Sequence, residues 1–275
     1  MIKDVIVNLA VGMERDPARD YALTIAEAFD AHLVGIALAY EHPLPGSILG
    51  ALPAELVGRA TRQHQKAVEA AVERFDAAAN AVSVEHIVKK VLERDAPVVL
   101  ANAARYFDAS VIMQSEPNGV DNNRLIEGLL FDSGRPVNIV PYVQREGLRL
   151  DRVVCCWDGS QPAARAINDA LPFLARARAI DLLIVINEKT QEDQYKILGV
   201  RMGKHLARHD IKVEVKTTVA PDIDVASAIL SYVADSAATL IVMGAYGHSR
   251  VRELVLGGAT RGILASMTVP VLMSH

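Results

Sequence analysis

Short apolar runs alternate with segments of helical periodicity in the first half of the chain. The run "VIVNLAVG" at 5–12 is followed by apolar residues at helical spacing up to Phe29, and residues 33–39 are continuously apolar. Continuous runs of this length are typical of strands buried on both faces, whereas the longer spacing indicates amphipathic helices. Composition and pattern predict further helices over residues 54–80 and 95–107.

The second half repeats this alternation. A helix is predicted over 161–174, where Pro172 must bend or end it, and "IDLLIVI" at 180–186 is predicted to be a buried strand. A helix over 222–236 then precedes the strand "TLIVM" at 239–243. Strands that alternate with helices in this way predict a parallel sheet covered by helices. Such sheets bind ligands at the carboxyl ends of their strands, where the strand order reverses.

Four short sequence similarities, which occur in the same order in both halves, suggest that the chain contains an internal repeat. The sequence therefore predicts an α/β fold of two tandem, doubly wound, five-stranded parallel-sheet domains, which is a Rossmann-like architecture. The predicted domains span residues 1–141 and 152–275, with a polar linker over 142–151. The similar pairs are "KDVIVNL" with "DRVVCCW", "VSVE" with "IKVE", "DASVIM" with "AATLIVM", and "RPVNIVP" with "VPVLM".

Bulk properties narrow the class of protein. The chain has 275 residues, enough for two ordinary domains, and its net charge of -4 argues against general nucleic-acid binding. No apolar run reaches membrane-spanning length, and the start "MIKDVIVNLAVG" does not resemble a signal peptide. We therefore expect a cytoplasmic protein with no membrane partner. Cys155 and Cys156 are neighbours in a predicted strand, so they should point to opposite faces and not pair. We expect no metal-ligand cluster.

The most informative motif is "LIVMGAYGHSRVRELVLGGATRGIL" at 240–264. Gly244 and Gly247 lie three residues apart, and nine residues then precede Gly257 and Gly258. The glycines thus bracket a loop between a strand end and a helix start. Glycine lets backbone approach a ligand closely, and a helix N-terminus favours an anion such as phosphate. The alternative is that the glycines only make turns. The same region also carries cationic or titratable residues, namely His248, Arg250, Arg252 and Arg261.

On these residues the second half resembles the universal stress protein A family. Its ATP-binding members carry G-x2-G-x9-G followed by Ser or Thr, and "CCWDGSQPAARAI" is similar to the family's first strand and turn. The resemblance implies an adenine nucleotide alpha hydrolase-like fold and an adenosine pocket with Asp158, whose alternative role is a turn residue or helix cap. It implies nucleotide-binding residues at Asp158, Gly244, Gly247, His248, Arg250, Gly257, Gly258, Ala259 and Thr260.

The chain departs from the family pattern in two places. Gly258 stands where the family has its Ser or Thr, so a hydroxyl for the terminal phosphate is missing unless Thr260 supplies one. The expected ligand is therefore ATP, ADP or AMP, with Mg²⁺. In the first half Gln114 and Pro117 replace the first two glycines, and Ala10 replaces Asp158. We interpret the first half as a degenerate, structural copy.

The resemblance also predicts the assembly, because family domains commonly dimerise through the last strand. Residues 136–141 should run antiparallel to residues 269–274, which would give an intramolecular pseudo-dimer and cover an apolar edge. Pairing with a second chain is a further expectation.

Three functions remain open. The first is a stress-response regulator that binds an adenine nucleotide and acts on an unidentified protein partner. The second is an enzyme, but "WDGSQPA" lacks the SGGxDS of related ATP pyrophosphatases, and a flavoprotein would be yellow when purified. Without a P-loop lysine or a visible general base, hydrolysis of ATP should be slow at most, and we assign no catalytic residue. The third is a ligand-free scaffold.

Overall fold

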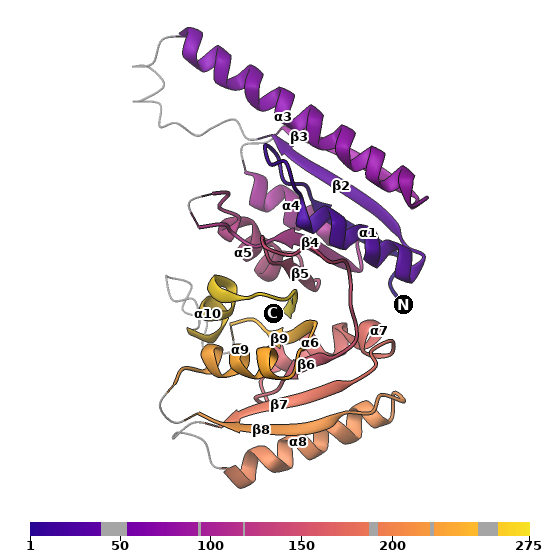
Figure 1. Ribbon diagram of the computed structural model, residues 1–275, viewed down its shortest axis with the longest axis vertical. Coiled ribbons are helices and arrows are strands. Elements are labelled where there is room, and N and C mark those ends of the chain that lie inside the picture. Colours follow the sequence, from indigo (N-terminus) through magenta and orange to yellow (C-terminus); the bar gives the residue numbers. More distant parts are fainter. Residues whose placement is uncertain (40–53, 93–94, 118, 187–191, 221–222, 247–257) are drawn as a thin grey trace. The chain divides into compact units, whose positions relative to one another are not determined.

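The computed structural model describes the chain in seven stretches and divides it into two compact units (Figure 1). Unit 1 contains Met1–Met113, Asn122–Arg135 and Arg145–Leu148, and unit 2 contains the rest. Residues around the last strand of the first half of the chain belong to unit 2. The described residues are 1–39, 54–92, 95–117, 119–186, 192–220, 223–246 and 258–275.

Unit 1 alternates strands and helices as predicted. Its strands are parallel and lie in the order β3-β2-β1-β4, so the order reverses at β1. The elements are β1 (Asp4–Asn8), α1 (Pro17–Phe29), β2 (His32–Ala39), α3 (Ala54–Ala81), β3 (His86–Leu92), α4 (Ala96–Ala104), β4 (Ala109–Met113) and α5 (Asn123–Asp132).

Local signals explain the first helix of this unit. The carboxylate of Asp16 accepts the backbone N–H of Arg19 at 3.0 Å, and Pro17 starts α1 with a backbone torsion suited to a helix. The helix buries Tyr21, Ile25 and other apolar residues against the strands, and it ends at Asp30 in the left-handed conformation.

Unit 2 has the same alternation with one strand added. The order β10-β9-β6-β7-β8 is parallel and reverses between β6 and β9, and β5 continues it beside β10. The elements are β5 (Val137–Val140), β6 (Val153–Cys156), α6 (Gln161–Asp169), α7 (Leu171–Leu174), β7 (Ile180–Ile186), α8 (Glu192–Ala207), β8 (Glu214–Val219), α9 (Val225–Asp235), β9 (Leu240–Gly244), α10 (Gly258–Ser266) and β10 (Val271–Ser274).

Two predicted features of unit 2 are present. The predicted helix over 161–174 is interrupted at Ala170, and Pro172 lies in the first turn of the short helix α7, as a residue without a backbone donor requires.

The thiols of Cys155 and Cys156 are both free, and burial raises their pKa values, that of Cys156 to about 12. The thiols are therefore protonated at neutral pH.

The antiparallel pairing of the two last strands is confirmed. Within unit 2, Val271 pairs with Ile139, Leu272 with Asn138, and Met273 with Val137. The strand β5 is fully buried, and this pairing gives its apolar residues a partner that a free edge would not.

The predicted linker is fixed at both ends. The N–H of Leu148 donates to Thr24 Oγ1 at 2.7 Å in unit 1, and Thr239 Oγ1 donates to the carbonyl of Arg149 at 2.9 Å in unit 2. Among the described helices, none combines the length and the apolar character needed to cross a membrane.

Candidate nucleotide site at the edge of unit 2

The predicted site residues fall at the carboxyl edge of β6 and β9, where the strand order reverses. Asp158 follows β6, Gly244 ends β9, and Gly258, Ala259 and Thr260 form the first turn of α10. Neighbouring parallel strands end at the same edge, so the first two positions are adjacent. The remaining predicted residues, Gly247, His248, Arg250 and Gly257, lie outside the described residues.

Asp158 shapes the turn between β6 and α6. Its Oδ1 accepts the backbone N–H of Ser160 at 2.8 Å, and Gly159 adopts a φ of +80°. Ser160 then caps α6 by accepting the N–H of Ala163 at 3.3 Å. The turn role of Asp158 is therefore present, while Ser160 acts as the helix cap. Asp158 remains exposed, so the same side chain can also meet a ligand.

Gly244 is required by the packing of α6. A Cβ atom at this position would overlap the backbone nitrogen of Ala163 and would lie 2.5 Å from the carbonyl carbon of Pro162. Backbone atoms cannot yield to such an overlap, so only glycine allows the first turn of α6 to sit against the end of β9. The close approach that this glycine permits is made by a helix of the same unit.

The start of α10 is tied to the end of β9. Thr260 is buried, and its Oγ1 accepts the backbone N–H of Tyr246 at 3.2 Å, which holds Tyr246 at a φ of 60°. The Thr260 hydroxyl therefore faces the beginning of the glycine loop. Among the described residues, no heavy atom would lie within 4 Å of a Cβ on Gly258. The first N–H groups of a helix have no partner within the helix, so those of α10 are available to a ligand.

Trp157, directly after β6, carries a polar atom at this edge that the sequence motifs did not single out. The backbone N–H of Trp157 donates to Leu183 at 2.8 Å, but its indole Nε1 is buried and has no acceptor among the described residues. A buried donor without an acceptor is unfavourable by about 1–3 kcal/mol. The signal was available in the sequence, because Trp157 directly precedes Asp158 at the ligand edge.

The corresponding positions in the first half of the chain are occupied differently. The N–H of Ala10 donates to Asp16 Oδ2 at 2.8 Å, so a buried carboxylate fills the first turn. Gln114, which replaces the first glycine of the loop, is also buried and belongs to unit 2. Its Nε2 donates to the carbonyl of Leu264 at 2.7 Å, near the end of α10.

Comparisons with known proteins agree with this architecture. Residues 149–275 match the model of the universal stress protein family. A universal stress protein of Synechocystis is 34% identical over 151 residues, which is 54% of this chain and 49% of that protein. The match thus spans about half the length of that curated relative.

Two solved structures share the fold over nearly the whole chain. A universal stress protein from Archaeoglobus fulgidus is 18% identical, with a TM-score of 0.71 over 98% of this chain and 95% of that one. A protein of unknown function from Pseudomonas aeruginosa is 13% identical, with a TM-score of 0.60 over 99% of this chain and 92% of its own. The chain therefore has the fold of these solved structures, and its residues 149–275 are similar in sequence to the universal stress protein family.

Proposed function

We propose that this protein is a stress-response regulator that binds one adenine nucleotide at the carboxyl edge of β6 and β9. ATP, ADP and AMP share the adenosine and the first phosphate, and these are the groups that the described residues suit. Asp158 would hydrogen-bond the adenosine portion, and the first turn of α10 would bind phosphate. The observation that supports this most strongly is that three separate segments meet at one edge.

Two contacts bring these three segments together. Gly244 lies against the first turn of α6, next to the turn of Asp158, and the Thr260 hydroxyl joins Tyr246 to the first turn of α10. The N-termini of α6 and α10 therefore belong to one cluster. Each helix N-terminus carries about half a positive charge, which favours an anion there. Arg250 and His248 lie between these ends in the sequence and would add positive charge.

A magnesium ion would enter with the nucleotide. Among the described residues, no group of three or more His, Cys, Asp or Glu side chains is placed to hold a metal. Magnesium commonly uses one or two carboxylates together with substrate phosphates, and Asp158 supplies one exposed carboxylate. These residues fit an ion that the phosphates help to hold.

One observation favours the alternative of a ligand-free scaffold. Packing accounts for Gly244, the turn accounts for Asp158, and the contact with Tyr246 accounts for Thr260. A domain that only preserved its architecture would need the same three residues. The two functions differ at Gly258, because no contact of the described residues requires glycine there.

Replacement of Gly258 separates the two functions. Gly258→Asp places a carboxylate at a helix N-terminus, where an acidic residue favours the helix and where no other described residue contacts the new Cβ. The fold should persist, while the affinity for Mg-ATP measured by titration calorimetry should fall at least about tenfold, or about 1.4 kcal/mol. Gly258→Asn, of equal size and without charge, should lose much less. Unchanged affinity in Gly258→Asp would remove α10 from the site, and no binding by the wild type would favour the scaffold.

A further inference from the structure

The strand β8 is an edge strand of the parallel sheet in unit 2. It pairs with β7 through Asp181–Glu214 and the five residue pairs that follow, and its other side has no strand beside it among the described residues. Its residues are exposed or half-exposed, and Val215 and Val219 are 41% and 68% exposed. A strand edge of this kind presents unpaired N–H and C=O groups that can pair with another chain.

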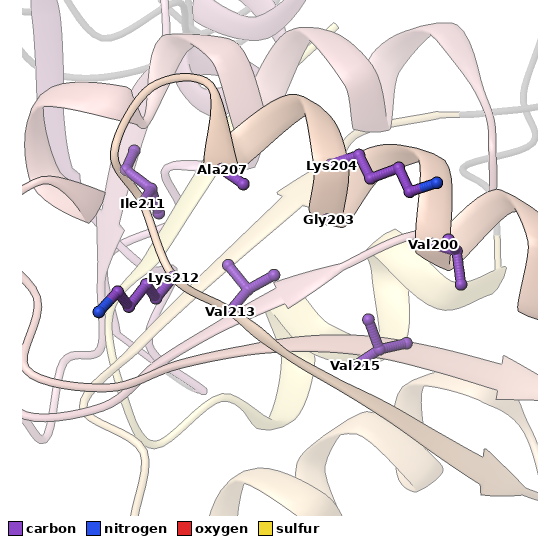
Figure 2. Close-up of a pocket in the computed structure, with 8 residues that line it drawn as sticks. All are labelled: Val200, Gly203, Lys204, Ala207, Ile211, Lys212, Val213 and Val215. Carbon is purple, nitrogen blue, oxygen red and sulfur yellow. The ribbon is translucent and has the colours of Figure 1, made fainter.

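An apolar groove runs beside this edge. It has a volume of about 410 Å³ and lies between α8 and the chain that leads into β8 (Figure 2). Figure 2 shows Val213 and Val215 on the strand side and Val200, Gly203 and Lys204 on the helix. Val200 and Ile197 on α8 are 51% and 55% exposed. The strand edge and the apolar residues of the helix therefore form one continuous surface.

The charges on β8 are complementary to their own antiparallel copy. Glu214 and Lys216 lie on the same face of the strand and pair at 2.7 Å. If two copies of β8 run antiparallel about Val215, Glu214 of each lies opposite Lys216 of the other. Opposite charges directly across two strands stabilise the pair, and the two-fold axis creates this contact twice.

The α8 helices of the two copies can also pack about this two-fold axis. Gly199 brings α8 close to both strands, because a Cβ there would lie 2.7 Å from Ile184 Cδ1 and 3.0 Å from Val215 Cγ1. The helix thus lies over β7 and β8. With strands about 4.8 Å apart, a two-fold axis beside β8 sets the two α8 helices about 10 Å apart, an ordinary separation for packed helices. The two helices would run antiparallel, so their dipoles would oppose each other favourably.

We propose that β8 and α8 form a two-fold interface with a second copy of this chain. The two β8 strands pair antiparallel about Val215, and Ile197 and Val200 of the two α8 helices close the groove. Unit 2 already uses antiparallel edge pairing once, where β5 meets β10. The proposed contact does not depend on nucleotide binding.

Charge reversal tests the interface in the full-length chain. By analytical ultracentrifugation the wild type should be a dimer, and Glu214→Lys or Lys216→Glu should raise the dissociation constant about tenfold or more, because like charges then face each other twice. The double variant Glu214→Lys/Lys216→Glu restores opposite pairs and should return to near the wild-type value. Circular dichroism checks that each variant is folded.

A cross-link tests the register. Val215→Cys would place two thiols opposite each other across the axis, within the Cα separation of about 4.4–6.8 Å that a disulfide needs. It should give a covalent dimer on oxidation. The control Val219→Cys should not, because the register separates its two thiols by about 27 Å. A monomeric wild type, or a dimer unaffected by both single charge reversals and not cross-linked through residue 215, would overturn the proposal and leave the groove to another kind of partner.

Discussion

The first turns of the two units occupy the same place in the topology and are built in opposite ways. In unit 2 the acidic residue, Asp158, is exposed and accepts a single backbone N–H within its own turn. In unit 1 the acidic residue, Asp16, is only 5% exposed and accepts the N–H groups of both Ala10 and Arg19. The turn of unit 2 therefore keeps its carboxylate at the surface, whereas the turn of unit 1 buries its carboxylate in hydrogen bonds with the backbone.

The strand ends β4 and β9 differ in the same sense. Gly244 has no side chain and lies against the first turn of α6. Gln114 fills the corresponding position with a buried side chain, which donates to Leu264 and accepts from the N–H of Tyr142 at 3.4 Å. At both positions the first half of the chain has a buried side chain with internal hydrogen bonds where the second half has an exposed carboxylate or a glycine.

The largest effect is expected at Gly244. Gly244→Val should destabilise the chain by about 3 kcal/mol or more, because its side chain would overlap backbone atoms of Pro162 and Ala163. Urea unfolding followed by circular dichroism measures this change. The control Gly258→Ala adds a methyl group in open space and should change stability by less than about 1 kcal/mol. Equal stability of Gly244→Val and the wild type would contradict the packing account of this glycine.

A smaller effect, with a distinct pH dependence, is expected at Asp16. Burial raises the pKa of Asp16 above its unfolded value, so the folded state holds the proton more tightly. The contribution of this group to stability therefore falls as pH rises above about 4, until the folded-state pKa is passed. Asp16→Asn should lower stability by about 1 kcal/mol through a lost hydrogen bond, and its unfolding free energy should decline less than that of the wild type between about pH 4 and 7.

Asp224 provides a control of opposite sign for that experiment. Hydrogen bonds from the hydroxyl and the N–H of Ser227 lower the pKa of Asp224. Its contribution is present above the ordinary aspartate pKa and is lost as pH falls through the lowered value. Urea titrations of Asp16→Asn and Asp224→Asn should therefore differ from wild type with opposite slopes in pH. Equal slopes of the two variants would contradict the opposite pKa shifts of the buried Asp16 carboxylate and the exposed Asp224 carboxylate.

At Gln114 we expect a loss of about 1–2 kcal/mol. Gln114→Leu keeps the volume and removes the donor to the Leu264 carbonyl and the acceptor for the Tyr142 N–H, so two partly buried backbone groups lose a partner. Thermal unfolding measures the loss, and Ser115→Ala, at the half-buried neighbour, should cause a smaller one. If Gln114→Leu proved as stable as the wild type, this connection would contribute nothing to the fold.

The smallest effect on stability is expected at Asp158. Asp158→Asn keeps an oxygen that can accept the N–H of Ser160, so the unfolding free energy should change by less than about 0.5 kcal/mol. Nucleotide affinity should nevertheless fall several-fold, because the carboxylate is lost. Calorimetric titration beside urea unfolding separates the two quantities. Loss of stability without loss of affinity would reduce Asp158 to a turn residue.

The sequence predicted the architecture well because its signals are local. Apolar runs and helical spacing determine the alternation. The pairing of residues 137–139 with 271–273 was anticipated by the family resemblance and not by a local signal. The interruption at Ala170, two residues before Pro172, was anticipated from the donor that proline lacks.

The contacts that explain individual residues of the site could not be predicted from local sequence signals. Gly244 is explained by Pro162 and Ala163, which lie some eighty residues earlier in the chain and meet it only in the folded unit. The bond from Gln114 to Leu264 joins residues 150 positions apart. A glycine pattern indicates that backbone comes close to something, but it does not say whether the neighbour is a ligand or a helix.

The central claim is that unit 2 binds a nucleotide and unit 1 does not, and counting the bound molecules tests it most directly. Equilibrium dialysis of the full-length chain against labelled Mg-ATP should saturate at one nucleotide per chain. Saturation at two would contradict the account by showing that the buried carboxylate of Asp16 does not close the first turn of unit 1 to a nucleotide. No binding by a folded chain would contradict it in the other direction and leave both domains structural.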